Sequence, residues 1–463
     1  MRPPAPDRII SRADLLQRRL GADLRDRLVA AIYRDAAGLA EGRVSRQGGR
    51  GAGFDRALDR IVTSRLWGLP IMFVGLAVVF WVTVAGANYP SQLLAAGLFW
   101  IEEQGARLFT ALGLPWWITG FVWHGTYKGL AWVVSVMLPP MAIFFPLFTF
   151  FEDLGYLPRV AFNLDRFFAA AGAHGKQALS MSMGFGCNAA GVIATRIIDS
   201  PRERLIAILT NNFVPCNGRF PTLIMIATLF VGASVPAALA SAAAAGAVVG
   251  VVILGIVTTL LVSAFLSKTV LKGEPSSFTL ELPPYRRPNF GHILYTSMID
   301  RTLFVLWRAI YMAAPAGAVI WTLSAITVGG ESLTVVLSNF LDPLGRAIGL
   351  DGVIILAYII AIPANEIVIP TILMAYTGAS QMIEITSMAE LYTLLVQGQG
   401  WTLLTAVSLM LFSLLHNPCS TTILTIWKET GNRKWTTVGA LMPLVIAFAV
   451  CFVVATLWRL VAG

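Results

Sequence analysis

Long apolar segments constrain this chain more than any other feature. They recur between residues 66 and 459, and several reach the roughly 20 residues that an α-helix needs to cross about 30 Å of hydrocarbon. Charged residues make up only 13% of the sequence, whereas a soluble domain carries about a quarter. The segments are continuously apolar, while the strands of a membrane β-barrel alternate apolar and polar residues. We therefore predict an all-α polytopic membrane protein.

The basic charge of the chain is concentrated ahead of the first apolar segment. Residues 1–65 hold fourteen Arg against eight Asp and Glu, which is +6 of the total net charge of +9. Arginine beside a first membrane span is usually a cytoplasmic retention signal and a contact for anionic lipid. We therefore expect a cytoplasmic N-terminus and anionic lipid as a partner, and we expect no binding of nucleic acid.

Residues 1–65 are predicted to form a basic cytoplasmic prelude of helices and linker. A leucine or isoleucine recurs every four residues, at Leu16, Leu20, Leu24, Leu28 and Ile32. This spacing favours an amphipathic helix from about residue 11 to residue 40, followed by a Gly-rich linker and a short helix that leads into the membrane. The apolar face of the long helix either rests on lipid or receives a partner protein.

The loops between the apolar segments predict the topology, because cytoplasmic loops carry an excess of Lys and Arg. We expect a first membrane half at 66–267, a cytoplasmic loop at 268–302 and a second membrane half at 303–463. Full spans are predicted at 66–87, 116–151, 204–232, 236–267, 303–328, 401–427 and 436–459. Residues 91–111 are predicted to form a separate interfacial helix on the outer side.

Two further apolar segments, 176–197 and 352–376, are interrupted by glycine or proline. The first has basic residues at both ends, and the second lies between loops that are almost free of Lys and Arg. We therefore expect two re-entrant hairpins that enter the membrane from opposite faces. Together with about seven full spans, this arrangement is typical of a transporter built from inverted repeats.

Four breaks in the apolar segments carry the polar chemistry. They read GFGCN (Gly184–Asn188), VPCNGR (Val214–Arg219), IPANE (Ile362–Glu366) and HNPCS (His416–Ser420). Unwound backbone survives in a membrane only where it is buried in protein or lines a watery cavity. Each break brings carbonyls, an amide and in three cases a thiol to one point, so we predict a ligand site. The candidate ligands are Cys187, Asn188, Cys216, Asn217, Asn365, Glu366, His416 and Cys419.

The single residues differ in how strongly they indicate function. A carboxylate within a span costs about 2.5–3.5 kcal/mol on insertion scales, so Glu366 is expected to face a cavity or a partner. Arg219 either neutralises Glu366 or extends to the membrane interface. His416 is either a ligand or a hydrogen-bonded structural residue. Cys451 lies in an uninterrupted apolar run and is expected to pack there as a small side chain.

The mixture of thiol, amide, carbonyl and carboxylate suits a borderline divalent metal better than Mg²⁺ or Ca²⁺, which prefer oxygen ligands alone. A permeation site must also release its ion, which favours a few moderate ligands over a tight four-thiolate cage. This chemistry does not separate Fe²⁺ from Mn²⁺, Co²⁺ or Zn²⁺, and an organic substrate stays open.

The gate region resembles a known family. The run GFGCNAAGVIATRIIDSPRERLIAILTNNFVPCNGRFPTLI resembles the first gate motif of the ferrous-iron transporter B family (FeoB), and ELPPYRRP, PANEIVIPTI and HNPCSTTILTIWKETGNRKW resemble its later signatures in the same order. The resemblance implies an importer of Fe²⁺ in the bacterial inner membrane, with Fe²⁺ as transported substrate and no bound cofactor. It places Cys187 and Cys216 on the ion path and Cys419 at a second gate. A small FeoA-like accessory protein is the partner that the resemblance suggests, and a homo-oligomer is compatible with it.

The sequence also departs from that family. A usual member begins with a GTP-binding domain, whereas no GxxxxGK[ST] loop occurs in these 463 residues. We therefore expect no enzyme activity from this chain and any GTP hydrolysis from a separate small G protein acting in trans. PCNGRFP stands where many members have a Ser-Cys-Ser-Ala-Arg-Leu-Pro run, and PANE replaces a more usual Ala-Lys-Glu. The alternatives are a gate-type transporter of another divalent metal or a nucleoside, and a membrane scaffold that transports nothing.

Overall fold

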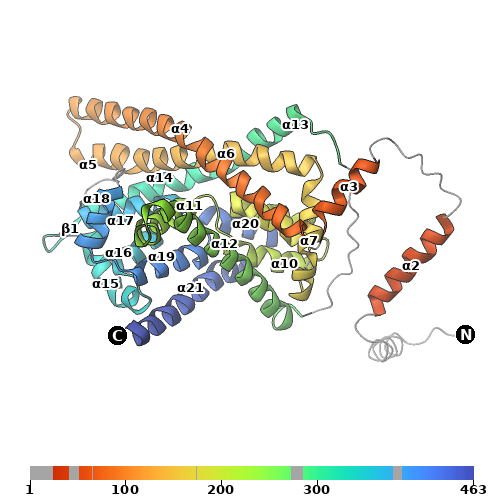
Figure 1. The fold of residues 1–463 in the computed structure, drawn as a ribbon. Helices are drawn as coiled ribbons and strands as arrows, with labels where there is room; N and C mark the ends of the chain where they lie inside the picture. The colour runs from red at the N-terminus through yellow and green to blue at the C-terminus, as the bar shows by residue number, and fades with distance from the viewer. Residues whose placement is uncertain are drawn as a thin grey trace, which may run out of the picture.

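The computed structural model describes residues 24–40, 52–64, 66–173, 175–272, 285–378 and 388–462. These residues are almost wholly helical (Figure 1). Within these ranges the only strands are β1 (Thr327–Val328) and β2 (Glu331–Ser332), which pair antiparallel in a small hairpin. The prediction of an all-α chain is therefore confirmed.

Two helices precede the membrane part. α2 (Leu24–Ala40) is exposed along its described side chains, Leu28 and Ile32 included, and α3 (Ala52–Val62) leads into the first long helix. The predicted helix from residue 11 is thus observed from residue 24 onward, and its earlier part, with Leu16 and Leu20, lies outside the described residues. The short helix expected before the membrane is present as α3.

Six helical stretches among the described residues are long and apolar enough to cross a membrane, and a bent pair brings the number to as many as seven. The bent pair is α15 (Leu333–Ala347) with α16 (Gly352–Ile360), which meet at 108°. The six stretches are Gly68–Ala111, Trp116–Asp153, Leu239–Lys268, Phe290–Ala325, Leu403–Thr430 and Arg433–Val461. These numbers agree with the prediction of a polytopic membrane protein.

The remaining elements complete these stretches. Three stretches are single helices, α4 (Gly68–Ala111), α12 (Ala237–Lys268) and α21 (Arg433–Ala462), and α7 (Tyr156–Ala170) lies between two of the stretches. Several stretches join shorter pieces, namely α5 (Trp116–Thr119), η1 (Gly120–Tyr127), α6 (Lys128–Asp153), α13 (Phe290–Tyr295), η6 (Thr296–Leu303), α14 (Phe304–Ala325), α19 (Leu403–Leu415) and α20 (Ser420–Thr430). The segment that precedes α19 holds α18 (Met388–Tyr392) and η8 (Thr393–Gly398).

Two predicted boundaries are wrong. The span expected at 66–87 and the interfacial helix expected at 91–111 form one continuous helix, α4, whose 44 residues measure about 66 Å at 1.5 Å per residue. The full span expected at 204–232 is itself broken into α10 (Pro201–Thr210), η3 (Asn211–Phe213), α11 (Phe220–Ile226), η4 (Ala227–Val231) and η5 (Gly232–Ser234). The interruption coincides with the Pro-Cys-Asn-Gly cluster, whose residues are poor in helix interiors.

Both segments predicted to be re-entrant, 176–197 and 352–376, are present as broken helical hairpins. The first is α8 (Gln177–Gly186) with α9 (Asn188–Ala194) and η2 (Thr195–Ile197), and the second is α16 with η7 (Asn365–Ile367) and α17 (Val368–Thr377). Lys176 forms an ion pair with Asp199 at 2.8 Å, and the Tyr376 hydroxyl donates to Asp351, so each hairpin is closed at its base by a side-chain contact. At each tip stands one extended residue, Cys187 (φ −153°, ψ 125°) and Ala364 (φ −153°, ψ 117°).

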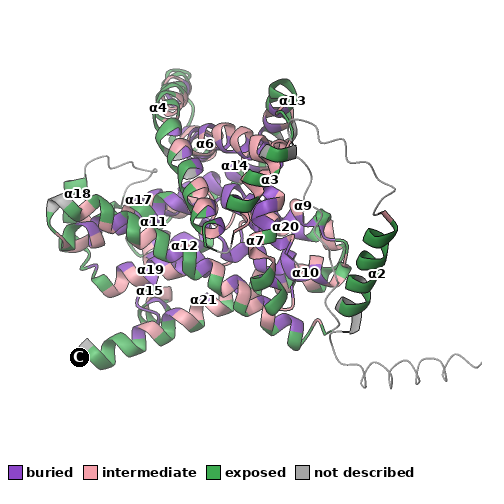
Figure 2. Ribbon diagram, turned by 45° about the vertical axis from the view of Figure 1, so that its right-hand side comes forward, coloured by how far each residue is buried: buried purple, intermediate pink, exposed green. Residues whose placement is uncertain are grey.

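The two hairpins enter from opposite ends of the molecule. In Figure 1, α3, α7 and α10 lie toward one end, and α5, α15, α18 and the C-terminus lie toward the other. Basic loops meet at the first end, where Arg196 and Arg204 both bind Glu429 at 2.6 Å. At the second end Arg459 of α21 donates to the backbone oxygen of Arg346 in α15. The buried residues gather between these ends, around α9, α14 and α20 (Figure 2).

Candidate functional site

The four breaks predicted from the sequence converge on one small cavity of about 30 Å³ in the middle of the molecule. Three thiols, three amides and one carboxylate line it, and they come from all four breaks. Seven of the eight candidate ligands are therefore brought together, namely Cys187, Asn188, Cys216, Asn217, Asn365, Glu366 and Cys419. His416 is the one candidate that does not line the cavity. The wall is completed by residues that carry no such signal in the sequence, Met137, Met141, Val305, Ala309, Thr421 and Thr422.

Backbone hydrogen bonds hold the breaks together in pairs. The amide N–H of Asn217 donates to the Gly186 oxygen at 3.3 Å, which joins the two breaks of the first half. The amide N–H of Ser420 donates to the Ile362 oxygen at 2.8 Å, which joins the two breaks of the second half. In each half, therefore, a re-entrant tip is tied to the break of the following helix, and the unwound carbonyls gain donors that a membrane does not supply.

Asparagine side chains add to the first pair of breaks. Asn211 Nδ2 donates to the backbone oxygen of Asn188 at 3.1 Å, and the amides of Asn188 and Asn212 face each other at 3.2 Å. This close approach requires a glycine opposite Asn211, because a Cβ on Gly191 would lie 2.5 Å from Asn211 Nδ2. Asn188 is only 3% exposed, so its amide belongs both to the cavity wall and to the packing of the tip.

Glu366 lies directly over a glycine of the opposite half. A Cβ added to Gly218 would stand 2.1 Å from Glu366 Oε1, which is far inside van der Waals contact. The Pro-Cys-Asn-Gly cluster thus supplies a glycine at the place where the carboxylate of the second half needs room. The carboxylate of Glu366 faces the cavity with Cys216 and Cys419.

Arg219 neither neutralises Glu366 nor extends to the membrane interface, the two alternatives predicted from the sequence. It is 1% exposed, so it does not extend to the interface, and its guanidinium binds backbone oxygens instead of Glu366. Its Nη1 donates to the oxygens of Asn212 at 2.9 Å and Leu414 at 2.8 Å. Its Nη2 donates to the oxygens of His416 at 3.2 Å and Asn417 at 3.3 Å. Arg219 therefore pins the break at 214–219 to the break at 416–420 across the two halves.

His416 also contributes contacts between the breaks at 214–219, 362–366 and 416–420. Its Nδ1 lies 2.9 Å from the Ser413 oxygen, and since a carbonyl only accepts, this nitrogen carries the proton. Its Nε2 lies 3.3 Å from Asn365 Oδ1, and its backbone oxygen accepts from Asn212 Nδ2 at 2.8 Å. The contacts of Nδ1 and of the backbone oxygen favour the structural role among the two alternatives for His416, while Nε2 finds no donor in Asn365 Oδ1. Cys451 is fully buried in the core, with Sγ 3.5 Å from the Ser408 oxygen, and lies away from the cavity.

The cavity is not a preformed metal cage in this conformation. Among the described residues no group of three or more His, Cys, Asp or Glu is placed so as to hold one metal ion. The Cys419 thiol lies 3.3 Å from Thr422 Oγ1, so its nearest polar partner is a hydroxyl of its own helix. The ligating groups share one cavity but do not yet converge on one point.

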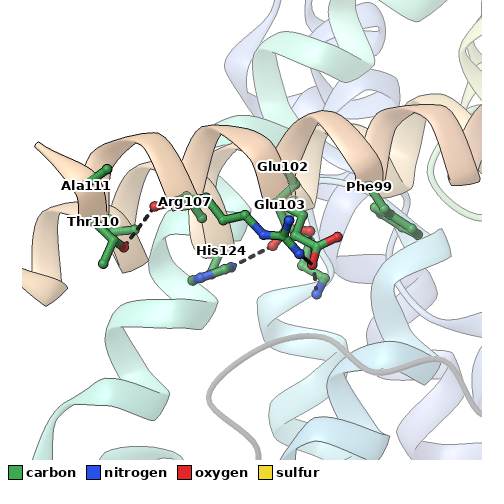
Figure 3. A pocket seen from close by; sticks show the side chains of 10 residues that line it. Phe99, Glu102, Glu103, Arg107, Thr110, Ala111 and His124 are labelled. Atoms are coloured by element: carbon green, nitrogen blue, oxygen red, sulfur yellow. Dashed lines mark hydrogen bonds and ion pairs between the residues drawn. The ribbon is translucent and has the colours of Figure 1, made fainter.

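A second, larger and open cavity of about 750 Å³ lies between the C-terminal part of α4 and the helices α5, η1 and α6. Figure 3 shows Glu102 of α4 pointing at His124, with Arg107 beside Glu103. Glu102 is 5% exposed, and its carboxylate lies 2.6 Å from His124 Nδ1 and 3.7 Å from Lys128 Nζ. Sequence reasoning missed this cluster, because it treated Glu102 as an exposed acidic residue of an interfacial helix.

Comparison with known proteins places the candidate site within a described family. The model for the Gate family, described as nucleoside recognition, matches residues 134–230 and 306–433, which contain all four breaks. The model for the ferrous iron transport protein B C terminus matches residues 248–300. No solved structure matches the chain.

Several relatives have FeoB in their names. The Fe(2+) transporter FeoB of Staphylococcus aureus (strain MSSA476) is 30% identical over 407 residues, which is 86% of this chain and 58% of that protein. The Fe(2+) transporter FeoB of Synechocystis is 27% identical over 401 residues, 86% of this chain and 62% of that protein. A Fe(2+) transport protein A/Fe(2+) transporter FeoB fusion protein of Porphyromonas gingivalis is 26% identical over 442 residues, 86% of this chain and 51% of that protein.

The chain thus spans between about half and two thirds of the length of these relatives. The matched family models and the relatives agree on the part that is shared, which is the helical membrane part with its gates. This chain belongs to the FeoB family of ferrous iron transport proteins and corresponds to their membrane part.

Proposed function

We propose that this chain conducts Fe²⁺ across the membrane through the cavity formed by the four broken helices. The observation that carries the proposal is the convergence of three thiols, three amides and one carboxylate from both halves on a single buried cavity. Three relatives named as Fe(2+) transporters, of Staphylococcus aureus, Synechocystis and Legionella pneumophila, support the choice of ion.

The size and lining of the cavity favour a single ion over a nucleoside. Its volume of about 30 Å³ exceeds the 10–15 Å³ or so that one water needs by only about a factor of two. No aromatic ring stands among its lining residues, so a nucleobase would find no stacking partner. The described conformation therefore supports a metal ion as the substrate, with the other divalent metals as its competitors.

The ligand set suits an ion that must be released. Fe²⁺ binds N, O and S ligands more weakly than Co²⁺, Ni²⁺ or Cu²⁺, and soft thiolates raise its affinity only moderately when few are used. We infer that Cys187, Cys216, Cys419 and Glu366 approach the ion in turn as it passes. Asn188, Asn217 and Asn365 would supply oxygen ligands that replace part of its hydration shell.

The distribution of basic residues supports import into a bacterial cytoplasm. The end that holds Arg196, Arg204 and the loop at 428–434 is proposed to be cytoplasmic, and the end that holds α5, α15 and α18 is proposed to face outward. We propose the inner membrane as its location, with anionic lipid beside the basic end.

Two protein partners belong to the same proposal. A relative in which an Fe(2+) transport protein A is fused to FeoB supports a small FeoA-like accessory protein as a partner. We further propose that GTP acts through a separate small G protein. The exposed face of α2 with Leu28 and Ile32 is a docking surface for such a partner. GTP hydrolysis by the purified chain alone would contradict this part, as would the failure of any nucleotide-binding protein to co-purify.

The central experiment measures Fe²⁺ uptake into proteoliposomes under reducing conditions. Cys187→Ser and Cys216→Ser exchange a soft ligand for a hard one of similar size, and each should lower uptake at least about tenfold, a loss of about 1.4 kcal/mol. Cys451→Ser is the control, because Cys451 is a buried cysteine that packs in the core away from the cavity. Equal uptake by all three variants would remove the thiols from the ion path.

Competition decides the nature of the substrate. Mn²⁺, Co²⁺ and Zn²⁺ are added to the same uptake assay, and labelled nucleosides are tested in parallel. Uptake of nucleoside but not of Fe²⁺ would replace the proposal with the nucleoside alternative. If neither is transported by well-folded protein, the scaffold alternative remains.

A further inference from the structure

Two further cavities continue from the central one toward the basic end. The nearer, of about 370 Å³, lies between α6, α7, α9 and the start of α14, and it shares Val305 with the central cavity. The farther, of about 330 Å³, shares Glu152, Pro158 and Arg301 with the nearer one. The three cavities therefore form a series, and each adjoining pair has wall residues in common.

An apolar neck separates the first two cavities. Met141 lines the central cavity, Met183 lines the nearer one and Val305 lines both. All three are buried, at 2%, 8% and 4% exposed, and they belong to one packed cluster that also contains Cys187. A hydrated ion does not pass this constriction until the three side chains move apart, because the ion would lose water without gaining ligands.

The path becomes polar and charged toward the basic end. Arg301 Nη2 lies 2.8 Å from Glu152 Oε2, and Arg301 Nη1 donates to Thr149 Oγ1 at 2.9 Å. Asp153 and His292 line the farther cavity beyond this ion pair. A cation that moves along the series thus meets the neck first and the Arg301–Glu152 pair at the mouth.

We propose that the ion leaves the central cavity toward the basic end through this series of cavities, with Met141, Met183 and Val305 as the gate and Arg301–Glu152 as the charged mouth. The inference rests on the proposed function for the identity of the ion, but the route itself is a property of the protein. The two methionines suit a gate, since their unbranched side chains change rotamer easily and their thioether sulfurs tolerate a soft ion at close range.

The alternative exit would run between the helices on another side of the central cavity. Met181 offers a matched comparison, because it lies two residues before Met183 on the same helix, α8, and is likewise buried, at 4% exposed. It packs in a different cluster, with Phe168, Phe185 and Leu209, and lines none of the three cavities. Met181→Ala therefore creates a similar loss of packing without widening the neck.

The test measures how fast Cys187 reacts with a small cationic thiol reagent in membrane vesicles of both orientations. Peptide mass spectrometry reads each cysteine separately, so the native cysteines are kept. Arg433→Cys marks the basic end, since Arg433 is exposed in the basic hairpin. We expect Met183→Ala to raise the rate at Cys187 from the basic end at least about tenfold, equal to a barrier about 1.4 kcal/mol lower, and Met181→Ala to leave it unchanged.

A charge test at the mouth completes the experiment. Ala194→Cys places a reporter in the wall of the nearer cavity, and anionic and cationic reagents of equal size are compared there. Glu152→Gln leaves the Arg301 charge unbalanced and should shift the ratio of rates toward the anionic reagent. Leu303 is 54% exposed near the start of α14, so Leu303→Cys serves as a control reporter. Glu152→Gln should not shift the ratio of rates at this cysteine.

The outcomes separate the route from the function. Equal rates at Cys187 in Met183→Ala and Met181→Ala, or faster reaction from the opposite end, overturn the route even if Fe²⁺ is transported. An opened neck together with an absence of Fe²⁺ uptake in the wild-type chain keeps the route and overturns the proposed ion. An unshifted ratio at Ala194→Cys overturns the role of the Arg301–Glu152 pair.

Discussion

Arg219 should be needed for folding of the site because of the carbonyls that it binds, not because of Glu366. Arg219→Met keeps a long side chain and removes all donors to the oxygens of Asn212, Leu414, His416 and Asn417. A hydrogen bond from a charged donor contributes about 1.5–3 kcal/mol. Counting only the two bonds shorter than 3.0 Å, at 2.9 and 2.8 Å, the expected loss is about 3–6 kcal/mol.

The free energy of unfolding is measured by SDS titration in mixed micelles, with the fluorescence of the 13 Trp as the signal. Arg107→Met is the control, since Arg107 is exposed and pairs only with Glu103 one turn away, and its loss should be within about 0.5 kcal/mol. Arg219→Lys retains the charge but not the forked geometry and should fall between the two. If adding Glu366→Gln restores the stability of Arg219→Met, Arg219 acts as a counter-charge, and the reasoning from the carbonyls is refuted.

Three further outcomes follow from the site, the ends and the N-terminal helix. Gly218→Ala places a methyl carbon 2.1 Å from Glu366 Oε1 and should lower Fe²⁺ uptake at least about tenfold at unchanged folded yield. Gly246→Ala is the control, because an added Cβ there meets nothing within 4 Å, and it should leave uptake unchanged. Equal uptake by both variants would contradict the position assigned to the Glu366 carboxylate. Arg433→Cys and Gln399→Cys should react with an impermeant thiol reagent from opposite sides of the membrane, and reaction from one side would refute the assignment of the ends. Asp59 accepts from Arg159 at 2.9 Å, which lowers the pKa of its carboxyl in the folded state. The contribution of this ion pair to the free energy of unfolding is therefore present above the unfolded pKa of Asp59 and is lost as the pH falls below about 4. Hydrogen exchange of residues 52–64 should speed up in that pH range, and Asp59→Asn should show the fast exchange already at neutral pH.

The breaks were predictable from the sequence because their cause is local. Glycine, proline and asparagine are unfavourable inside helices, so runs such as GFGCN and HNPCS stand out against apolar surroundings. The hairpin shape of the two segments was predictable as well, and side-chain contacts at Lys176–Asp199 and Asp351–Tyr376 close their bases. The membrane faces from which they enter, which were inferred from the charge of the flanking loops, stay a prediction.

What the sequence did not reveal depends on partners that are distant along the chain. Glu102 was expected to be an exposed residue of a separate interfacial helix, yet it is buried against His124 and Lys128 as part of the continuous helix α4. Arg219 finds backbone oxygens that every residue type possesses, and no sequence pattern marks which carbonyls are left without a helical partner. The seat of Glu366 on Gly218 likewise becomes visible only when the two halves are placed together.

The junction made by Arg219 also has a consequence for biosynthesis. Its partner Leu414 lies 195 residues later in the chain, and Asn212 donates to an oxygen 204 residues later. At about 5–20 residues per second, a ribosome needs about 10–40 s to supply these acceptors after Arg219 has emerged. During that interval the Arg219 guanidinium and the Asn212 side-chain amide lack the later oxygens to which they donate in the folded chain. The nascent first half is thus the stage most exposed to quality-control proteases, and linking both halves in one polypeptide shortens the wait by keeping the second half at high effective concentration.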